Sequence, residues 1–232
     1  MNAKSTFHAF AHRGGRAHGA DNTLPAFEEA LRRGAPGLET DAWLTADGVV
    51  VLDHDGVHRT AKRRHKPMAQ VGRDELPAHV PTLDALYAAC GTDFDLAIDV
   101  RIPEVAAAVI EVSRRHDATS RLWLVGGAPA LLTSWLALEH GGHLVLSIRL
   151  FERRMDVARA ARQAGATALN MRWPWWTRSF VREVHDAGLL AFGYDVQREW
   201  TMRHCLKLGL DGIFSDHVDR MAALLDATTR EP

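Results

Sequence analysis

Cysteine is scarce in this 232-residue chain, which contains only Cys90 and Cys205. Each falls in a helix-like segment, so we expect no disulfide framework, and neither belongs to a Cys-x-x-Cys motif of the kind used in zinc or redox sites. This usage is typical of a reducing compartment. We therefore predict a cytoplasmic location.

Long hydrophobic runs are also absent. No stretch approaches the roughly 18 to 20 apolar residues that cross a bilayer, and residues 1–10 lack the apolar run of a secretory signal. The formal net charge is -1, which gives no basic surface for a nucleic acid. The one basic cluster, Lys62 to Lys66, is predicted to be a solvated loop rather than a lipid-binding patch. We expect neither an integral membrane segment nor a nucleic-acid partner.

Several catalytic motifs are missing as well. The chain has no Gly-x-Ser-x-Gly elbow, no Gly-x-x-x-x-Gly-Lys loop and no Gly-x-Gly-x-x-Gly after a strand. Its four lysines all lie outside predicted strand ends, which argues against a Schiff-base enzyme. The chemistry has to come from other residue types.

What is present is a regular alternation of short apolar runs and amphipathic segments. Eight runs are predicted strands: 7–11, 37–43, 94–100, 121–125, 143–147, 166–170, 189–194 and 211–214. Helices are expected near 23–33, 82–90, 103–116, 129–140, 152–164, 177–187, 199–208 and 217–227. Eight strand-helix units predict an α/β fold of the (β/α)8 TIM-barrel type, in a single domain covering 1–232.

One connection is unusually long and runs over residues 44–81. It begins with a predicted hairpin, whose turn is Thr45-Ala46-Asp47-Gly48 and whose returning strand ends on His54. Loops that follow the strands surround the mouth of a TIM barrel, where active sites of this fold lie. We therefore expect a short insertion after the second strand, placed beside the site.

Acidic side chains converge at the predicted mouth. Glu39 and Asp41 share a face of the second strand because side chains alternate along a strand. Buried so close, they would repel unless a cation lay between them, and oxygen ligands favour Mg²⁺ or Ca²⁺, with Mn²⁺ also possible. Asp99, at the end of the third strand, would add a third carboxylate. The alternative is that these acids simply pair with arginines such as Arg13 or Arg101.

Histidine is common, with 13 residues, but two histidines stand out. His12 and His54 each close an apolar strand and therefore lie at the predicted mouth. A neutral imidazole accepts a proton near pH 7 and an imidazolium donates one, so this pair suits acid and base roles. His8 and His18, near the first strand, are weaker candidates, and His217 is assigned no role.

Arginine and tryptophan supply candidate substrate contacts. Arg13 and Arg101 would offer planar forks to phosphate oxygens. Trp175, in the cluster after the sixth strand, is predicted to line a leaving-group pocket; the alternative is packing or an oligomer contact. A cation for the phosphoryl oxygens, an acid and a base are what phosphodiester cleavage requires. The residues therefore predict a metal-assisted phosphodiesterase.

An ordered set of motifs resembles the glycerophosphodiester phosphodiesterase family. The motifs are Ala11-His12-Arg13-Gly14, Asp21-Asn22-Thr23, Gly37-Leu38-Glu39-Thr40-Asp41, His54-Asp55, Asp99-Val100-Arg101 and Asp211-Gly212-Ile213-Phe214-Ser215-Asp216. The resemblance covers nearly the whole chain and is most specific in the first third. The chain departs from the family pattern in having Asp21 for Glu, and Asp99 and Arg101 for Glu and Lys.

The resemblance implies a barrel enzyme that uses a divalent ion to hydrolyse glycerophosphodiesters to sn-glycerol 3-phosphate and an alcohol. By position it makes His12 and His54 the acid/base pair, Glu39, Asp41 and Asp99 the metal ligands, and Arg13 and Arg101 the phosphate contacts. The shorter Asp99 carboxylate reaches less far toward an ion than Glu does, so a water-bridged contact is one expectation for it.

The hypothesis for the reaction has two steps. One histidine deprotonates the glycerol 2-hydroxyl, which attacks phosphorus while the other histidine protonates the departing alcohol; water then opens the cyclic phosphate. The sequence leaves open which histidine begins as the base. The alternatives are headgroup hydrolysis of the lysophospholipase D type in the same site, or a barrel that binds a phosphorylated metabolite without turnover. The expected partner is a small-molecule substrate, and the expected state is a monomer or homodimer.

Overall fold

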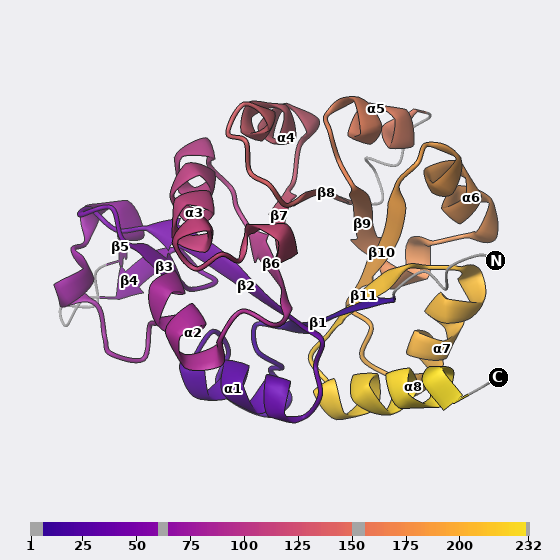
Figure 1. The fold of residues 1–232 in the computed structure, drawn as a ribbon, viewed down its shortest axis with the longest axis horizontal. Coiled ribbons are helices and arrows are strands. Elements are labelled where there is room, and N and C mark those ends of the chain that lie inside the picture. Colours follow the sequence, from indigo (N-terminus) through magenta and orange to yellow (C-terminus); the bar gives the residue numbers. More distant parts are fainter. Residues whose placement is uncertain (1–6, 60–64, 150–155, 231–232) are drawn as a thin grey trace.

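Eight parallel strands form a closed barrel in the computed structural model, which describes residues 7–59, 65–149 and 156–230 (Figure 1). Around the barrel the order is β1-β11-β10-β9-β8-β7-β6-β2, and pairing of β1 with β2 closes it. These strands are β1 (His8–His12), β2 (Gly37–Leu44), β6 (Asp95–Asp99), β7 (Leu122–Gly126), β8 (His143–Ile148), β9 (Ala168–Arg172), β10 (Leu190–Tyr194) and β11 (Gly212–Ser215). The predicted TIM barrel is confirmed.

The helices cover the outside of the barrel, as Figure 1 shows. They are α1 (Leu24–Arg32), α2 (Leu83–Cys90), α3 (Pro103–Arg115), α4 (Pro129–Leu136), α5 (Val157–Gln163), α6 (Arg178–Asp186), α7 (Glu199–Leu208) and α8 (Val218–Arg230). The hydroxyl of Thr82 accepts a hydrogen bond from the Ala85 amide and so caps α2. The first residues predicted for the fifth helix, 152–155, lie outside the described residues.

The predicted insertion follows β2. Its first strand, β3 (Val50–Leu52), pairs antiparallel with the end of β2 through a turn in which Gly48 takes a φ of +79°. Beyond it lie β4 (Val57–Arg59), β5 (His65–Pro67) and the short 3₁₀ turns η1 (Met68–Gln70) and η2 (Arg73–Glu75). The insertion has its own apolar cluster of Val51, Met68, Val71, Leu76 and Val80. Of the basic cluster, residues 62–64 lie outside the described residues, and Lys66 is exposed in β5.

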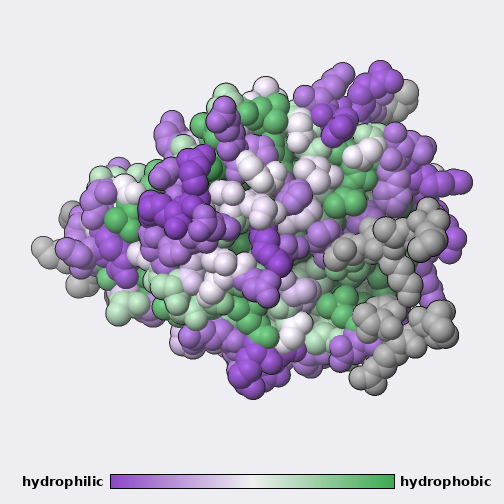
Figure 2. Space-filling model, in the orientation of Figure 1, coloured by the Kyte–Doolittle hydropathy of each residue, from purple (hydrophilic) through white to green (hydrophobic). Residues whose placement is uncertain are grey.

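Large apolar side chains fill the barrel interior. Phe10, Trp123, Phe192 and Phe214 pack together there, with the rings of Phe10 and Phe214 stacked at 4.7 Å. A larger cluster lies between the strands and the helices. On the face shown in Figure 2, hydrophilic residues gather over the insertion and around much of the periphery, with hydrophobic patches between them. Within the three described ranges, every helix is too short or too polar to traverse a lipid bilayer.

Candidate active site

A tight turn after β1 places the first candidate residues. His12 is the last residue of β1, and the next three residues, Arg13, Gly14 and Gly15, have φ angles of +50°, +80° and +82°. Glycine favours this left-handed backbone, whereas Arg13 adopts it at some cost in strain. The turn directs the Arg13 amide at Glu39, to whose Oε2 it donates a hydrogen bond of 3.0 Å.

Strand register brings the predicted residues together. His12 of β1 lies opposite Glu39 of β2, and Asp41 of β2 lies opposite Asp99 of β6. All four side chains therefore lie toward the carboxyl ends of three adjacent strands. This is the end of a TIM barrel that carries the active site.

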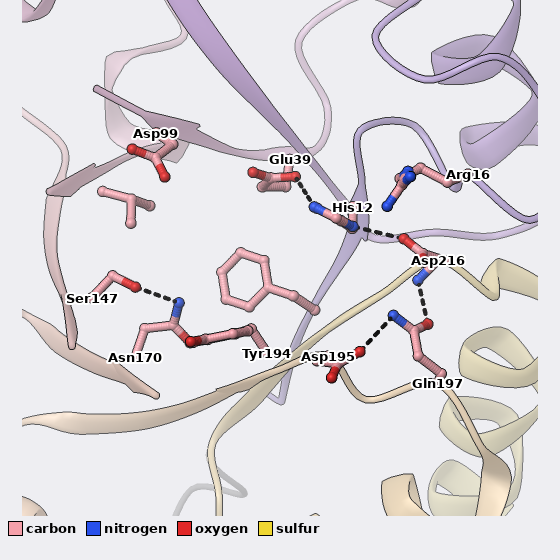
Figure 3. Close-up of a pocket in the computed structure, with 12 residues that line it drawn as sticks. His12, Arg16, Glu39, Asp99, Ser147, Asn170, Tyr194, Asp195, Gln197 and Asp216 are labelled. Atoms are coloured by element: carbon pink, nitrogen blue, oxygen red, sulfur yellow. Dashed lines mark hydrogen bonds and ion pairs between the residues drawn. The ribbon is translucent and has the colours of Figure 1, made fainter. Parts of the chain in front are cut away.

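His12 is held between two acids. Its Nε2 lies 3.9 Å from Glu39 Oε2, and its Nδ1 hydrogen-bonds Asp216 Oδ1 at 2.6 Å, as Figure 3 shows. Burial lowers the pKa of His12, but the charges of Glu39 and Asp216 and the hydrogen bond to Asp216 outweigh it and raise the pKa above its ordinary value. Gln197 holds the backbone of Asp216 in place, because its Oε1 accepts a hydrogen bond of 2.8 Å from the Asp216 backbone amide.

The three carboxylates repel one another in a buried setting. Burial, with the charges of Asp41 and Asp99 adding to it, raises the pKa of Glu39 to about 7. Burial and the charge of Asp41 raise the pKa of Asp99 to about 6, and burial also raises the pKa of Asp41. Such groups gain most from a cation that replaces their protons.

Arginine pairing, the alternative predicted for these acids, is found at Asp41. Arg13 Nε lies 3.4 Å from Asp41 Oδ2, and Arg101 Nη2 lies 3.3 Å from Asp41 Oδ1. Even so, Arg13 Nε and Asp41 Oδ2 are buried without a hydrogen-bond partner. Arg101 packs over Trp43, with its Cζ 5.3 Å from the ring centroid. Both predicted phosphate contacts therefore lie beside the carboxylates.

The donor set fits a hard divalent ion. Glu39 and Asp41 are 8% and 4% exposed, and Asp41 Oδ2, which accepts no hydrogen bond, is an oxygen that could coordinate an ion. In the described part of the chain, the oxygens of Glu39, Asp41 and Asp99 do not all lie within 4.8 Å of one another. Binding one ion through all three would therefore require side-chain rotation.

His54 reaches the same mouth from the insertion. The hairpin is tied to β2 by a hydrogen bond of 3.1 Å from the Asp53 amide to the Asp41 carbonyl. His54 bonds Asp55 at 2.8 Å. It lines a hollow shared with Arg13, whereas His12 lines a different cavity together with Glu39 and Asp99, named here the His12 cavity.

The His12 cavity measures about 420 Å³ and is also lined by residues that the sequence did not mark as candidates. Its polar lining is His12, Arg16, Glu39, Asp99, Ser147, Asn170, Tyr194, Asp195, Gln197 and Asp216 (Figure 3). Ser147, Asn170 and Tyr194 lie toward the carboxyl ends of β8, β9 and β10. These three residues end predicted strands, as His12 and Asp99 do, so the same pattern in the sequence could have marked them as candidates.

Two other candidates lie apart from this cavity. Trp175 follows β9, where the Arg172 Cζ lies 6.0 Å from its ring, and it is not among the residues lining the His12 cavity. Its contact with substrate remains a prediction. Packing explains its neighbour Trp176, whose indole donates to the Phe192 carbonyl at 3.0 Å. His8, at the opposite end of β1, pairs with Asp95 at 3.0 Å and so has no place in this site.

Residues 12–220 match the model of the Glycerophosphoryl diester phosphodiesterase family. The chain belongs to this family. It is 30% identical to a probable glycerophosphodiester phosphodiesterase 2 of Mycobacterium tuberculosis, over 94% of this chain and 90% of that protein. The predicted family resemblance is therefore confirmed.

Solved structures show the same fold. The crystal structure of a protein named "Putative glycerophosphoryl diester phosphodiesterase" from Silicibacter pomeroyi superposes with a TM-score of 0.87 at 23% identity, covering 97% of this chain and 95% of that one. A phosphodiesterase of Oleispira antarctica, solved in complex with its product sn-glycerol-3-phosphate, superposes with a TM-score of 0.83 at 20% identity, covering 94% and 96%.

Proposed function

We propose that the chain hydrolyses glycerophosphodiesters to sn-glycerol 3-phosphate and an alcohol in a reaction that depends on a divalent ion. The observation that carries this proposal is the placement of His12, Glu39 and Asp99 in one cavity, with Asp41 beside them, at the carboxyl ends of adjacent barrel strands. Family membership supports the same reaction class.

Glu39, Asp41 and Asp99 would hold the ion, with Mg²⁺ or Ca²⁺ favoured by an all-oxygen donor set. A bound ion would offset negative charge on the phosphoryl oxygens. Arg13 and Arg101 add guanidinium groups on either side of Asp41. A phosphate that enters the site can take over the donors these arginines now direct at Asp41.

We assign His12 as the first acid. Asp216 lies outside the proposed ligand set and stabilises the imidazolium through its 2.6 Å hydrogen bond. Although burial raises the pKa of Asp216, the hydrogen bond and charge of His12 lower it below its usual range, so the carboxylate stays ionised. A protonated His12 can donate its Nε2 proton to the oxygen of the departing alcohol.

His54 then becomes the first base. It takes the proton of the glycerol 2-hydroxyl, whose oxygen attacks phosphorus in line while the bond from phosphorus to the alcohol oxygen breaks. His12 supplies the proton that the alcohol needs. In the second step His12 accepts a proton from water, the water oxygen opens the cyclic phosphate, and His54 returns its proton to the 2-hydroxyl.

The test measures release of sn-glycerol 3-phosphate from glycerophosphocholine and related diesters, with and without a chelator. Wild type should be active and should lose activity with the chelator, and His12→Ala, His54→Ala and Glu39→Gln should each be strongly impaired. A substrate that lacks the 2-hydroxyl should react far more slowly. Equal turnover of that analogue would contradict the cyclic route.

Two results would redirect the assignment. Faster turnover of a lysophospholipid than of glycerophosphocholine would indicate headgroup hydrolysis of the lysophospholipase D type. Tight binding of sn-glycerol 3-phosphate with no turnover of any diester, unchanged in His12→Ala, would indicate a binding barrel.

A further inference from the structure

A second group of metal-ligand side chains lies outside the carboxylate site. His18 comes from the loop between β1 and α1, His217 directly precedes α8, and Asp219 lies in the first turn of α8. One donor atom from each lies within 4.8 Å of the other two, and no other trio among the described residues meets this distance. The phosphodiesterase reaction proposed above uses none of the three.

The three side chains face one another. His18 Nε2 is 3.0 Å from Asp219 Oδ1, and the rings of His18 and His217 are nearly perpendicular, with centroids 6.3 Å apart. The His18 side chain is 16% exposed and that of Asp219 is 51% exposed. The donors are thus partly sheltered but open to an ion from solvent.

The backbone already holds the two contributing segments together. The Ala17 amide donates to the Asp216 carbonyl at 3.2 Å, and the His18 amide donates to the Gly15 carbonyl at 2.9 Å. A Cβ on Gly15 would lie only 2.6 Å from Val218, so the segments are also in close contact there. Binding an ion would therefore require little further ordering of the backbone.

We propose that His18, His217 and Asp219 form a second metal site, selective for a borderline-soft divalent ion such as Zn²⁺ or Co²⁺. Two imidazoles and one carboxylate suit these ions, whereas the all-oxygen set of the catalytic cavity suits Mg²⁺ or Ca²⁺. Zinc-ligand bonds of about 2.0 to 2.2 Å set tetrahedral donors roughly 3.3 Å apart. His18 Nε2 and Asp219 Oδ1, which are 3.0 Å apart, would therefore separate slightly and exchange their hydrogen bond for bonds to the ion. Solvent would supply the fourth position.

Occupation of this site would fasten the β1–α1 loop to α8. The same loop carries Arg16, which lines the catalytic cavity, and Asp216, the partner of His12, is the residue before His217. The ion would act by positioning these elements and would not touch substrate. We therefore expect Zn²⁺ to raise the thermal unfolding temperature.

The experiment uses metal alone as the probe, with a protein free of any polyhistidine tag. Excess Mg²⁺ occupies the carboxylate site while Zn²⁺ is titrated by calorimetry and Co²⁺ by its visible absorption. Wild type should bind one Zn²⁺ per chain. His217→Asn and Asp219→Asn should each weaken binding by roughly tenfold or more.

Two controls separate this site from the rest of the protein. Glu39→Gln should bind Zn²⁺ as wild type does. His185→Asn removes another histidine paired with an aspartate, at 2.8 Å from Asp211, but one without a third donor, and it should also bind normally. Circular dichroism restricts the comparison to folded variants, and His18→Gln provides an independent ligand change from the other segment.

Unchanged Zn²⁺ affinity in the folded ligand variants would overturn the proposal. So would loss of the Zn²⁺ in Glu39→Gln alone, because that would place the ion in the catalytic cavity. Since no substrate is present, neither result bears on whether the protein is a phosphodiesterase.

Discussion

The two ends of the barrel use similar residue types in opposite ways. At the amino end, His8 bonds Asp95 at 3.0 Å, and His143 stacks on Trp123 with ring centroids 4.0 Å apart. At the carboxyl end, Glu39 and two further carboxylates are crowded together, and their pKa values are raised by burial. The amino end is paired and packed, whereas the carboxyl end buries carboxyl groups whose ionised forms a cation would stabilise.

Strand β1 shows the contrast within five residues. His8, Phe10 and His12 alternate along the strand and share its inward face. His8 pairs with Asp95 and Phe10 packs among aromatic rings. His12 forms a hydrogen bond with Asp216 beside the cavity. The position of a histidine along this strand therefore decides whether it is paired at the closed amino end or lies beside the cavity at the carboxyl end.

The largest expected effect tests the functional side of this contrast. His12→Ala should lower kcat/KM for release of sn-glycerol 3-phosphate by about 10² to 10⁴, because a positioned acid and base typically contributes that much. His8→Gln, at the other end of the same strand, is the matched control and should stay within about threefold of wild type. A similar loss of kcat/KM in both variants would contradict the different roles given to His12 and His8.

The next effect tests the stability side. Phe10 is fully buried, so Phe10→Ala should lower the free energy of unfolding by about 3 to 5 kcal/mol in urea denaturation. Trp200→Ala, at a side chain that is 56% exposed, should change it by no more than about 0.5 kcal/mol. Equal losses would show that the barrel interior is not the main source of stability.

A smaller effect depends on pH. The pKa of Glu39 rises from an ordinary 4.5 to about 7 on folding, so its protonated form is favoured in the metal-free fold. The stability of chelator-treated wild type relative to Glu39→Gln should therefore fall as pH increases from about 4.5 to about 7, by on the order of 1 to 3 kcal/mol. Denaturation of both proteins across that range measures the difference. A constant or rising difference would contradict a buried, proton-holding Glu39.

The smallest effect concerns the pair at the amino end. His8→Gln should lower the free energy of unfolding by about 1 kcal/mol, as expected for loss of one partly buried hydrogen bond. The same denaturation assay measures it. A loss as large as that of Phe10→Ala would mean that the polar pair, and not the aromatic interior, holds this end together.

Local patterns were enough to predict much of the fold. Alternating apolar runs indicated the eight barrel strands, and Thr45-Ala46-Asp47-Gly48 indicated the turn into the insertion. They also predicted that His12, Glu39, Asp41 and Asp99 lie at the barrel mouth, where the structure places them, because strand ends and side-chain alternation are properties of neighbouring residues. The pairing of Asp41 with both arginines was one of two outcomes that these patterns left open.

Contacts between distant segments escaped that reasoning. Asp216 and His12 are 204 positions apart, and His18 and Asp219 are 201 positions apart. Both contacts exist because the last barrel strand, β11, pairs with the first, β1, placing Ala11 beside Ser215. Local order therefore determined the barrel, its insertion and the residues around its mouth, since strand periodicity and turn chemistry act over a few residues. Only the closed barrel decided which residues of the last strand-helix unit contact residues of the first unit. The register between β11 and β1 depends on how all eight strands pack together.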